Sequence, residues 1–96
     1  MPSHFVDPRE LRVMSRLGGA DPFKLQRQIA LFGASTSGMP APWVYEGMDG
    51  VFVLFNGVTR ATRVAKLNPG TMIRVEVIGR LPRRCANLPR IGDLLP

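Results

Sequence analysis

The chain has 96 residues, enough for one modest hydrophobic core but not for two. Hydrophobic residues make up 45% and charged residues 21%, as in ordinary globular domains, and no apolar run reaches the roughly 18 residues that span a bilayer. The single cysteine, Cys85, cannot form an internal disulfide, and the N-terminus lacks the pattern of a signal peptide. We therefore expect no membrane partner and a cytoplasmic location, or a piece of a larger exported protein.

The positive charge is concentrated in the C-terminal part of the chain. Up to Gly57 the basic and acidic side chains balance, so the formal net charge of +6 belongs to the residues that follow. Most of the basic residues are arginines, whose planar guanidinium grips phosphate in two places. This pattern predicts a polyanionic partner, which can be a nucleotide, a nucleic acid or an acidic protein surface. The alternative is a basic face that serves solubility.

The N-terminal segment predicts a short strand followed by a capped turn. Ser3–Val6 is expected to form the strand. Asp7 followed by Pro8 has the pattern of a helix N-cap and first helical position. Gly18-Gly19 is expected to interrupt the chain.

The next segment predicts an amphipathic helix that begins at Asp21-Pro22 and ends at Gly33. Its apolar residues recur at helical spacing and predict a stripe that faces the core, formed by Leu25, Ile29 and Phe32. Residues 34–42 are rich in Ser, Gly and Pro and predict a mobile loop.

Two strands and a hairpin turn are expected in the middle of the chain. Trp43–Glu46 is rich in β-forming residues, and Gly-Met-Asp-Gly at residues 47–50 is typical of a hairpin turn. Residues 51–55 are apolar throughout, which predicts a strand that is covered on both faces.

A second helix is expected over residues 59–67, with an inner side formed by Ala61, Val64 and Ala65. Asn-Pro-Gly at residues 68–70 ends it, and residues 72–78 then alternate as in a half-buried strand whose inner side is Ile73, Val75 and Val77. Residues 91–95 predict one closing helical turn.

The turn between the apolar strand and the second helix is the best candidate for a functional site. Gly57 predicts a tight turn that delivers Thr59 and Arg60 onto the first helical turn. That geometry suits an anion, because the free N–H groups of a helix start carry partial positive charge and a glycine lets a ligand approach the backbone. Arg63, one turn later, either extends this surface or is simply solvated.

The order of elements resembles the core of the ParB/sulfiredoxin superfamily over about residues 5–79. The resemblance rests on Pro-Trp-Val at 42–44, Gly-Val-Phe-Val-Leu-Phe-Asn-Gly-Val-Thr-Arg-Ala at 50–61, Val-Ala-Lys-Leu at 64–67 and Ile-Arg-Val-Glu-Val at 73–77. It implies an α+β domain over residues 1–79, with a mixed β-sheet, a Gly-x-x-Arg turn that opens a helix, and helices packed on the sheet. Residues 80–96 would be a basic, Pro- and Arg-rich C-terminal extension.

The resemblance also implies a ligand and its contacts. Members of this superfamily bind a nucleoside triphosphate or diphosphate, with Mg²⁺, at this turn. Gly57 would be the turn glycine, Thr59 and Arg60 would contact phosphate, and the N–H groups from Val58 to Ala61 would complete an anion nest.

An acidic partner for the turn is expected near the N-terminus, because related enzymes use an acidic residue there. Asp7 and Glu10 are the candidates. The alternative is that Asp7 caps a turn and Glu10 is exposed.

Two departures from the family pattern restrict the chemistry. Val58 stands where sulfiredoxins have their catalytic cysteine, so reductase chemistry is not expected. Asn56 stands where many relatives have an aspartate, and an amide cannot act as a base. No Cys/His cluster has the spacing of metal ligands, so no metal site is predicted.

Three functions stay open, and the sequence leaves undecided whether the protein is an enzyme. The first is a non-catalytic nucleotide- or phosphate-binding module. The second is a small basic nuclease or toxin domain, for which the candidate bases and metal ligands are Asp7, Glu10, Asp21, Glu46 and Asp49. The third is a protein-interaction module with a degenerate site.

Two further groups of residues have alternative interpretations. The C-terminal arginines are expected to bind nucleic acid or an acidic partner, and they are Arg80, Arg83, Arg84 and Arg90. Trp43 and Tyr45 can stack on a base, but covering the sheet or core is the interpretation we favour for them.

Overall fold

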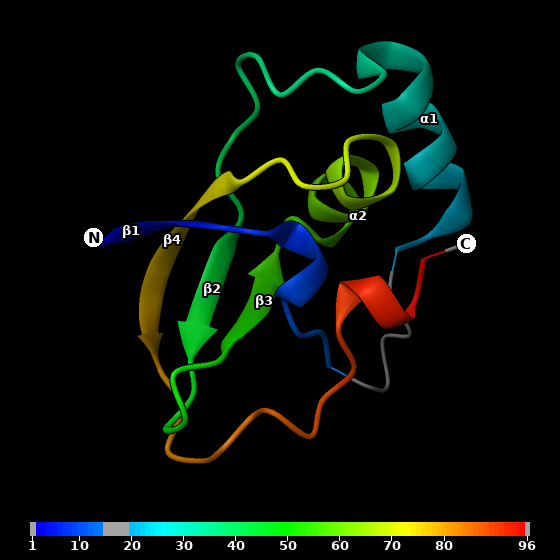
Figure 1. Ribbon diagram of the computed structural model, residues 1–96. Helices are drawn as coiled ribbons and strands as arrows, with labels where there is room; N and C mark the ends of the chain where they lie inside the picture. Colours follow the sequence, from blue (N-terminus) through cyan, green and yellow to red (C-terminus); the bar gives the residue numbers. More distant parts are fainter. Residues whose placement is uncertain (1, 15–19, 96) are drawn as a thin grey trace.

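Four strands form one mixed sheet in the order β1-β4-β2-β3 in the computed structural model, which describes residues 2–14 and 20–95 (Figure 1). β1 pairs with β4 and β2 pairs with β3 in antiparallel fashion, whereas β2 and β4 are parallel. The bounds of the strands are β1 Ser3–Val6, β2 Trp43–Glu46, β3 Phe52–Asn56 and β4 Ile73–Arg80. The predicted α+β class and mixed sheet are confirmed, whereas the ParB-like assignment stays a prediction.

Helix α1 spans Pro22–Phe32 and helix α2 spans Val58–Leu67. The Asp21 carboxylate caps α1 by accepting a hydrogen bond from the backbone N–H of Phe23 at 2.9 Å, as the Asp-Pro pattern predicts. Two short 3-10 helices complete the fold, η1 Pro8–Glu10 and η3 Ile91–Asp93. The break expected at Gly18-Gly19 lies outside the described residues.

The helices lie to one side of the sheet and form successive layers (Figure 1). The inner side of α2 is buried against the sheet as predicted, with Val64 fully covered beside Val44 and Val75. Helix α1 packs mainly against α2 instead of the sheet. Because only a narrow line of α1 is covered, Leu25 is buried but Phe32 is 50% exposed, so the predicted inward stripe is only partly correct.

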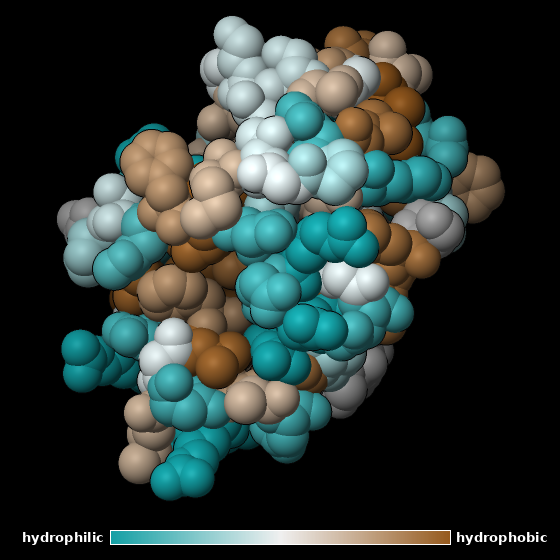
Figure 2. All heavy atoms as spheres, viewed as in Figure 1, coloured by the Kyte–Doolittle hydropathy of each residue, from teal (hydrophilic) through white to brown (hydrophobic). Residues whose placement is uncertain are grey.

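The outer layer keeps apolar side chains at the surface. Figure 2 shows hydrophobic residues over α1, at the upper right of the view, beside hydrophilic residues across the middle of this face. Strand β3 is also less covered than its apolar sequence predicts, because Phe55 is 56% exposed. The helices cover the face of the sheet to which Leu54 points. On the opposite face Val53 is 2% exposed, so the expectation of two covered faces is confirmed for Val53 but wrong for Phe55.

The C-terminal segment is part of the same core. Residues 11–13 lie beside β3, where the Arg12 N–H donates to the Phe52 carbonyl at 2.9 Å. Residues 89–91 in turn lie beside residues 11–13, where the Ile91 N–H donates to the Leu11 carbonyl at 2.8 Å. Ile91 is 1% exposed and belongs to the central apolar cluster. The segment after β4 therefore returns across the molecule and packs with the N-terminal segment.

The β2–β3 hairpin anchors this returning segment. The turn forms at residues 47–50 as predicted, and the Asp49 carboxylate in it accepts hydrogen bonds from the backbone N–H groups of Cys85 at 3.0 Å and Ala86 at 2.9 Å. Cys85 is fully buried there. Within the described ranges, no helix combines the length and the apolarity needed to cross a membrane.

Candidate functional site

The first turn of α2 opens into a cavity of about 420 Å³ between α1 and α2. Gly57 is the N-cap residue and supplies no side-chain cap, so the N–H groups of Val58, Thr59 and Arg60 are those of an uncapped helix start. All three residues line the cavity. The Ala61 N–H donates to the Gly57 carbonyl at 2.9 Å, so it does not belong to the predicted nest.

Gly57 is required by the packing of the turn. Its φ of 92° lies in the left-handed region that favours glycine. A Cβ at this position would lie 2.7 Å from Cβ of Pro42 and 3.0 Å from Nη2 of Arg60. A side chain at this position would therefore collide with the chain before β2 and with the guanidinium of the same site.

Helix α1 contributes two cations that the sequence analysis did not assign to the site. Lys24 and Arg27 line the cavity together with Gln28 and Leu31. The spacing of these four residues places them on one face of α1, a signal that was present in the sequence. The sequence did not indicate that this face lies against the start of α2.

Arg60 joins the cavity to the end of β3. Its Nη2 lies 3.5 Å from Oδ1 of Asn56, and the backbone N–H of Trp43 donates to the same oxygen at 3.4 Å. Its Nε is buried and has no hydrogen-bond partner among the described residues. Because no carboxylate of the described residues lines the cavity, the positive charges of Lys24, Arg27 and Arg60 are uncompensated there.

Arg63 is buried rather than solvated, with 1% of its surface exposed. Its Nη1 donates to the carbonyls of Gly33 and Ser35, both at 2.7 Å, and the guanidinium lies 5.4 Å from the centre of the Phe32 ring. Burial lowers the pKa of Arg63 below its ordinary value. The side chain therefore holds the start of the 34–42 loop against α2.

Arg63 also lines a second cavity of about 230 Å³. This cavity shares Gln28 and Arg60 with the first, and its other walls include the apolar side chains of Phe32, Met39 and Pro40. The two cavities therefore meet at Arg60, one rich in cations and the other largely apolar.

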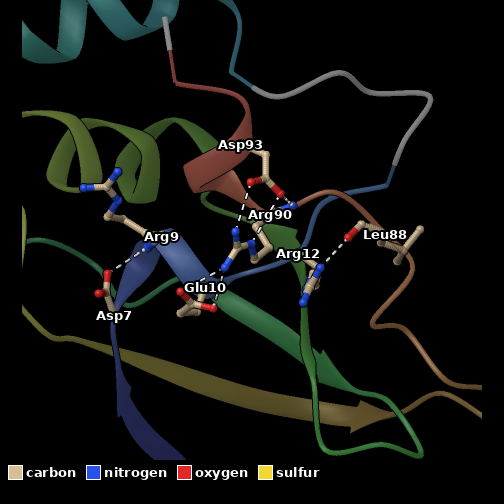
Figure 3. Close-up of polar contacts among 7 residues, drawn as sticks. All are labelled: Asp7, Arg9, Glu10, Arg12, Leu88, Arg90 and Asp93. Atoms are coloured by element: carbon tan, nitrogen blue, oxygen red, sulfur yellow. Dashed lines mark hydrogen bonds and ion pairs between the residues drawn. The ribbon is translucent and has the colours of Figure 1, made fainter.

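The predicted acidic partners of the turn lie elsewhere. Asp7 caps η1 by accepting from the Arg9 N–H at 3.0 Å, as the sequence also allowed. Glu10 forms an ion pair with Arg90 at 3.3 Å, and Figure 3 shows the Arg90 guanidinium between Glu10 and Asp93. In the described part of the chain, neither Asp7 nor Glu10 forms an ion pair with Arg60.

The ion pairs of Arg90 with Glu10 and Asp93 join the N-terminal and C-terminal segments of the chain. The hydrogen bond to Asp93 and then that to Glu10 raise the pKa of Arg90, and the Arg90 guanidinium lowers the pKa of Asp93. Arg12 donates to the Leu88 carbonyl at 2.8 Å beside them (Figure 3). Arg90 is thus engaged within the fold, unlike the open cation that the sequence predicted for a nucleic-acid or partner surface.

The other C-terminal arginines differ in their surroundings. Arg80 lies 3.7 Å from Glu46, but its side chain is 84% exposed. Arg83 and Arg84 are exposed, and no ion pair of either is found among the described residues. Both follow β4 beside the hairpin, where the Met48 N–H donates to the Arg83 carbonyl at 2.8 Å.

Each carboxylate that the sequence left as a candidate base or metal ligand of a nuclease has a structural partner in the fold. Asp7 and Asp21 cap helix starts. Glu10 and Glu46 pair with arginines, and Asp49 anchors the returning segment. None of them lines the cavity at the start of α2. Over the described residues, no group of three or more His, Cys, Asp or Glu side chains is placed to hold a metal ion.

Comparison of the chain with models of protein families, with curated proteins and with solved structures found no match.

Proposed function

We propose that this protein is a nucleotide- or phosphate-binding domain whose site is the cavity at the start of α2. The observation that carries the proposal is that an uncapped helix start and three cationic side chains, Lys24, Arg27 and Arg60, meet in one cavity that no carboxylate of residues 2–14 and 20–95 lines. Helix starts bind anions because their N–H groups point at the ligand and the helix dipole favours negative charge. The cations add charge-assisted hydrogen bonds to phosphate oxygens.

The size and lining of the two cavities favour a nucleotide over free phosphate. The first cavity, about 420 Å³, lies within the range of small-molecule sites. The second adds an apolar wall of Phe32 and Met39 next to Arg60. In this arrangement the phosphates lie at the start of α2 and the nucleoside extends past Arg60 toward Phe32.

The family resemblance points to the same ligand, and it too stays a proposal. Both the family resemblance and the proposed binding site rest on the Gly-x-x-Arg turn. Between the functions left open by the sequence, the structural partners of the five carboxylates favour a binding site over a nuclease.

Thermal unfolding in the presence of ligands tests the proposal. A ligand that binds only the folded protein stabilises it by about 2.7 kcal/mol at a hundred times its Kd. We expect one of ATP, ADP, CTP or GTP to raise the Tm of the wild type more than inorganic phosphate does.

Two variants locate the site in this experiment. Arg60→Ala is expected to lose the ligand-induced shift relative to its own ligand-free Tm. Arg84→Ala removes the same charge from an exposed position outside the cavity and is expected to keep the shift. Equal shifts in all three proteins would contradict a site at the start of α2.

A further inference from the structure

The outer face of the β2–β3 hairpin carries a cluster of three aromatic rings, Trp43, Tyr45 and Phe55. Val44 and Leu54, which alternate with them, point into the core, so the three rings lie on the face opposite α2. The Trp43 and Phe55 rings are nearly parallel, with centres 6.5 Å apart and an angle of 12°, and Tyr45 meets Phe55 edge-on at 5.7 Å. We call this group the aromatic face.

The aromatic face is ordered but left open to solvent. Gly79 of β4 makes room for the Tyr45 ring, because a Cβ there would lie 3.1 Å from it. Trp43 remains 40% exposed and Phe55 56% exposed. Contiguous exposed rings held in mutual contact are typical of an interaction surface, whereas single exposed apolar residues are not.

Cations lie at both ends of the aromatic face. At one end Arg60 reaches Asn56, whose side-chain oxygen also accepts from the Trp43 N–H. At the hairpin end lie Arg83 and Arg84, exposed and without an ion pair in the part of the chain that the structure describes. A strand of this length separates the ends by roughly 13 Å, which a few nucleotides of one strand can bridge.

Two of the three carboxylates near the ends of the aromatic face are paired with arginines, and the third, Asp49, accepts from the backbone N–H groups of Cys85 and Ala86. Glu46 pairs with Arg80 at 3.7 Å, and Glu76 pairs with Arg74 at 3.3 Å. Arg60 at one end and Arg83 with Arg84 at the other outnumber Asp49, so the charge that a partner meets at the ends of the aromatic face is net positive. An anionic partner with flat apolar surfaces fits this combination better than an apolar protein surface does.

We propose that the aromatic face binds single-stranded nucleic acid, with unpaired bases stacked on Trp43 and Phe55 and with phosphates at Arg83 and Arg84. Aromatic side chains stack on bases whose faces are free, so a duplex is a poor substrate for this surface. The aromatic face shares only Arg60 with the nucleotide site, because Lys24 and Arg27 of that site lie on α1, on the other side of the sheet, and the proposed phosphate contacts are at Arg83 and Arg84.

The single tryptophan of the chain makes the test direct. A labelled single-stranded oligonucleotide of mixed sequence is titrated into the full chain, and tryptophan fluorescence is recorded together with fluorescence anisotropy. A base stacked on Trp43 is expected to quench its emission as the complex forms. A duplex of the same length is expected to bind more weakly and to quench less.

A matched pair of variants separates stacking from nonspecific attraction. Phe55→Leu keeps an apolar side chain but removes the flat ring, and we expect it to weaken binding by about fivefold or more. Phe23→Leu is the same change at a position on α1 that is 88% exposed, and its affinity is expected to equal that of the wild type. Thermal unfolding checks that both variants fold, which their exposure favours.

A charge variant and a cavity variant complete the experiment. Arg83→Ala combined with Arg84→Ala is expected to weaken binding. It is also expected to reduce the slope of log affinity against log salt concentration by the equivalent of up to about two phosphate contacts. Lys24→Ala is expected to weaken nucleotide binding but to leave quenching by the oligonucleotide unchanged. Absent quenching, equal affinity of the Phe55 and Phe23 variants, or equal binding of duplex and single strand would each overturn the proposal.

Discussion

Replacing Ile91 by alanine tests whether the C-terminal segment belongs to the core of the domain. The resemblance implied a domain that ends near residue 79, followed by an extension. In the structure Ile91 is 1% exposed and its N–H binds the Leu11 carbonyl, so the side chain is as buried as those of the sheet. We therefore expect Ile91→Ala to destabilise the whole domain.

The magnitude follows from the atoms removed. The change deletes three carbon groups, each worth roughly 0.8 kcal/mol when buried, or about 2.4 kcal/mol in total. The cavity left in a packed core adds to this, and buried Ile→Ala changes cost about 2–5 kcal/mol. In a domain of this size each kcal/mol shifts the Tm by about 4–8 °C, so a fall of at least about 10 °C is expected.

Urea denaturation followed by circular dichroism, with thermal unfolding as a second measurement, provides the assay. The control is Leu31→Ala, because Leu31 is 66% exposed on α1 and its truncation is expected to change stability by less than about 0.5 kcal/mol. If Ile91→Ala lowered the free energy of unfolding no more than the control, the C-terminal segment would not pack in the core.

Three further predictions concern Gly57, Arg63 and Asp49. Gly57→Ala is expected to lower the free energy of unfolding, measured by urea denaturation, by about 1–3 kcal/mol, because it places a Cβ at positive φ and against Pro42. An unchanged midpoint would contradict the requirement for glycine in this turn. Arg63→Ala is expected to lower the free energy of unfolding by at least about 2 kcal/mol, because two hydrogen bonds from a charged donor are lost and a cavity is left, in part offset by removal of a desolvated charge. Faster proteolysis within residues 34–42 provides a second measurement. Wild-type stability together with a wild-type rate of proteolysis would exclude that Arg63 holds this loop against α2. Burial raises the pKa of Asp49, but hydrogen bonds from backbone N–H groups, first among them those of Ala86 and Cys85, together outweigh this effect and lower the pKa. The contribution of Asp49 to stability is therefore present above the unfolded pKa of about 3.9 and is lost as the pH falls through the lower folded pKa. The difference in Tm between wild type and Asp49→Asn is therefore expected to shrink between about pH 5 and pH 2, and a difference that stays constant with pH would refute this sign.

Much of the local structure could be predicted because its causes are local. Asp21 caps the helix that follows it, since a carboxylate reaches the N–H groups two and three residues later whatever the rest of the chain does. The turn at residues 47–50 and the alternation in β4 follow equally from neighbouring residues. The α+β class follows from these elements taken together.

The candidate site was predicted in part. Gly57, Val58, Thr59 and Arg60 line one cavity, and the sequence identified all four from the turn that precedes α2. It did not identify Lys24, although the spacing of its helix face was visible, because that residue belongs to a helix more than thirty positions earlier. Its position near the turn depends on the packing of α1 against α2.

The sequence by itself determined which segments form strands, turns and helices, with ends that differ from those of the structure by a residue or two, and where the net positive charge lies along the chain. The tertiary structure decided what the charges do: Arg63 is buried under the loop, Arg90 is bound between Glu10 and Asp93, and Arg83 stays open. It also decided that the rings of Trp43 and Phe55 meet on the face of the sheet away from α2, where both stay partly exposed. The physical reason is that capping and turn energies act over a few residues, whereas burial and ion pairing depend on which distant segments the core brings together.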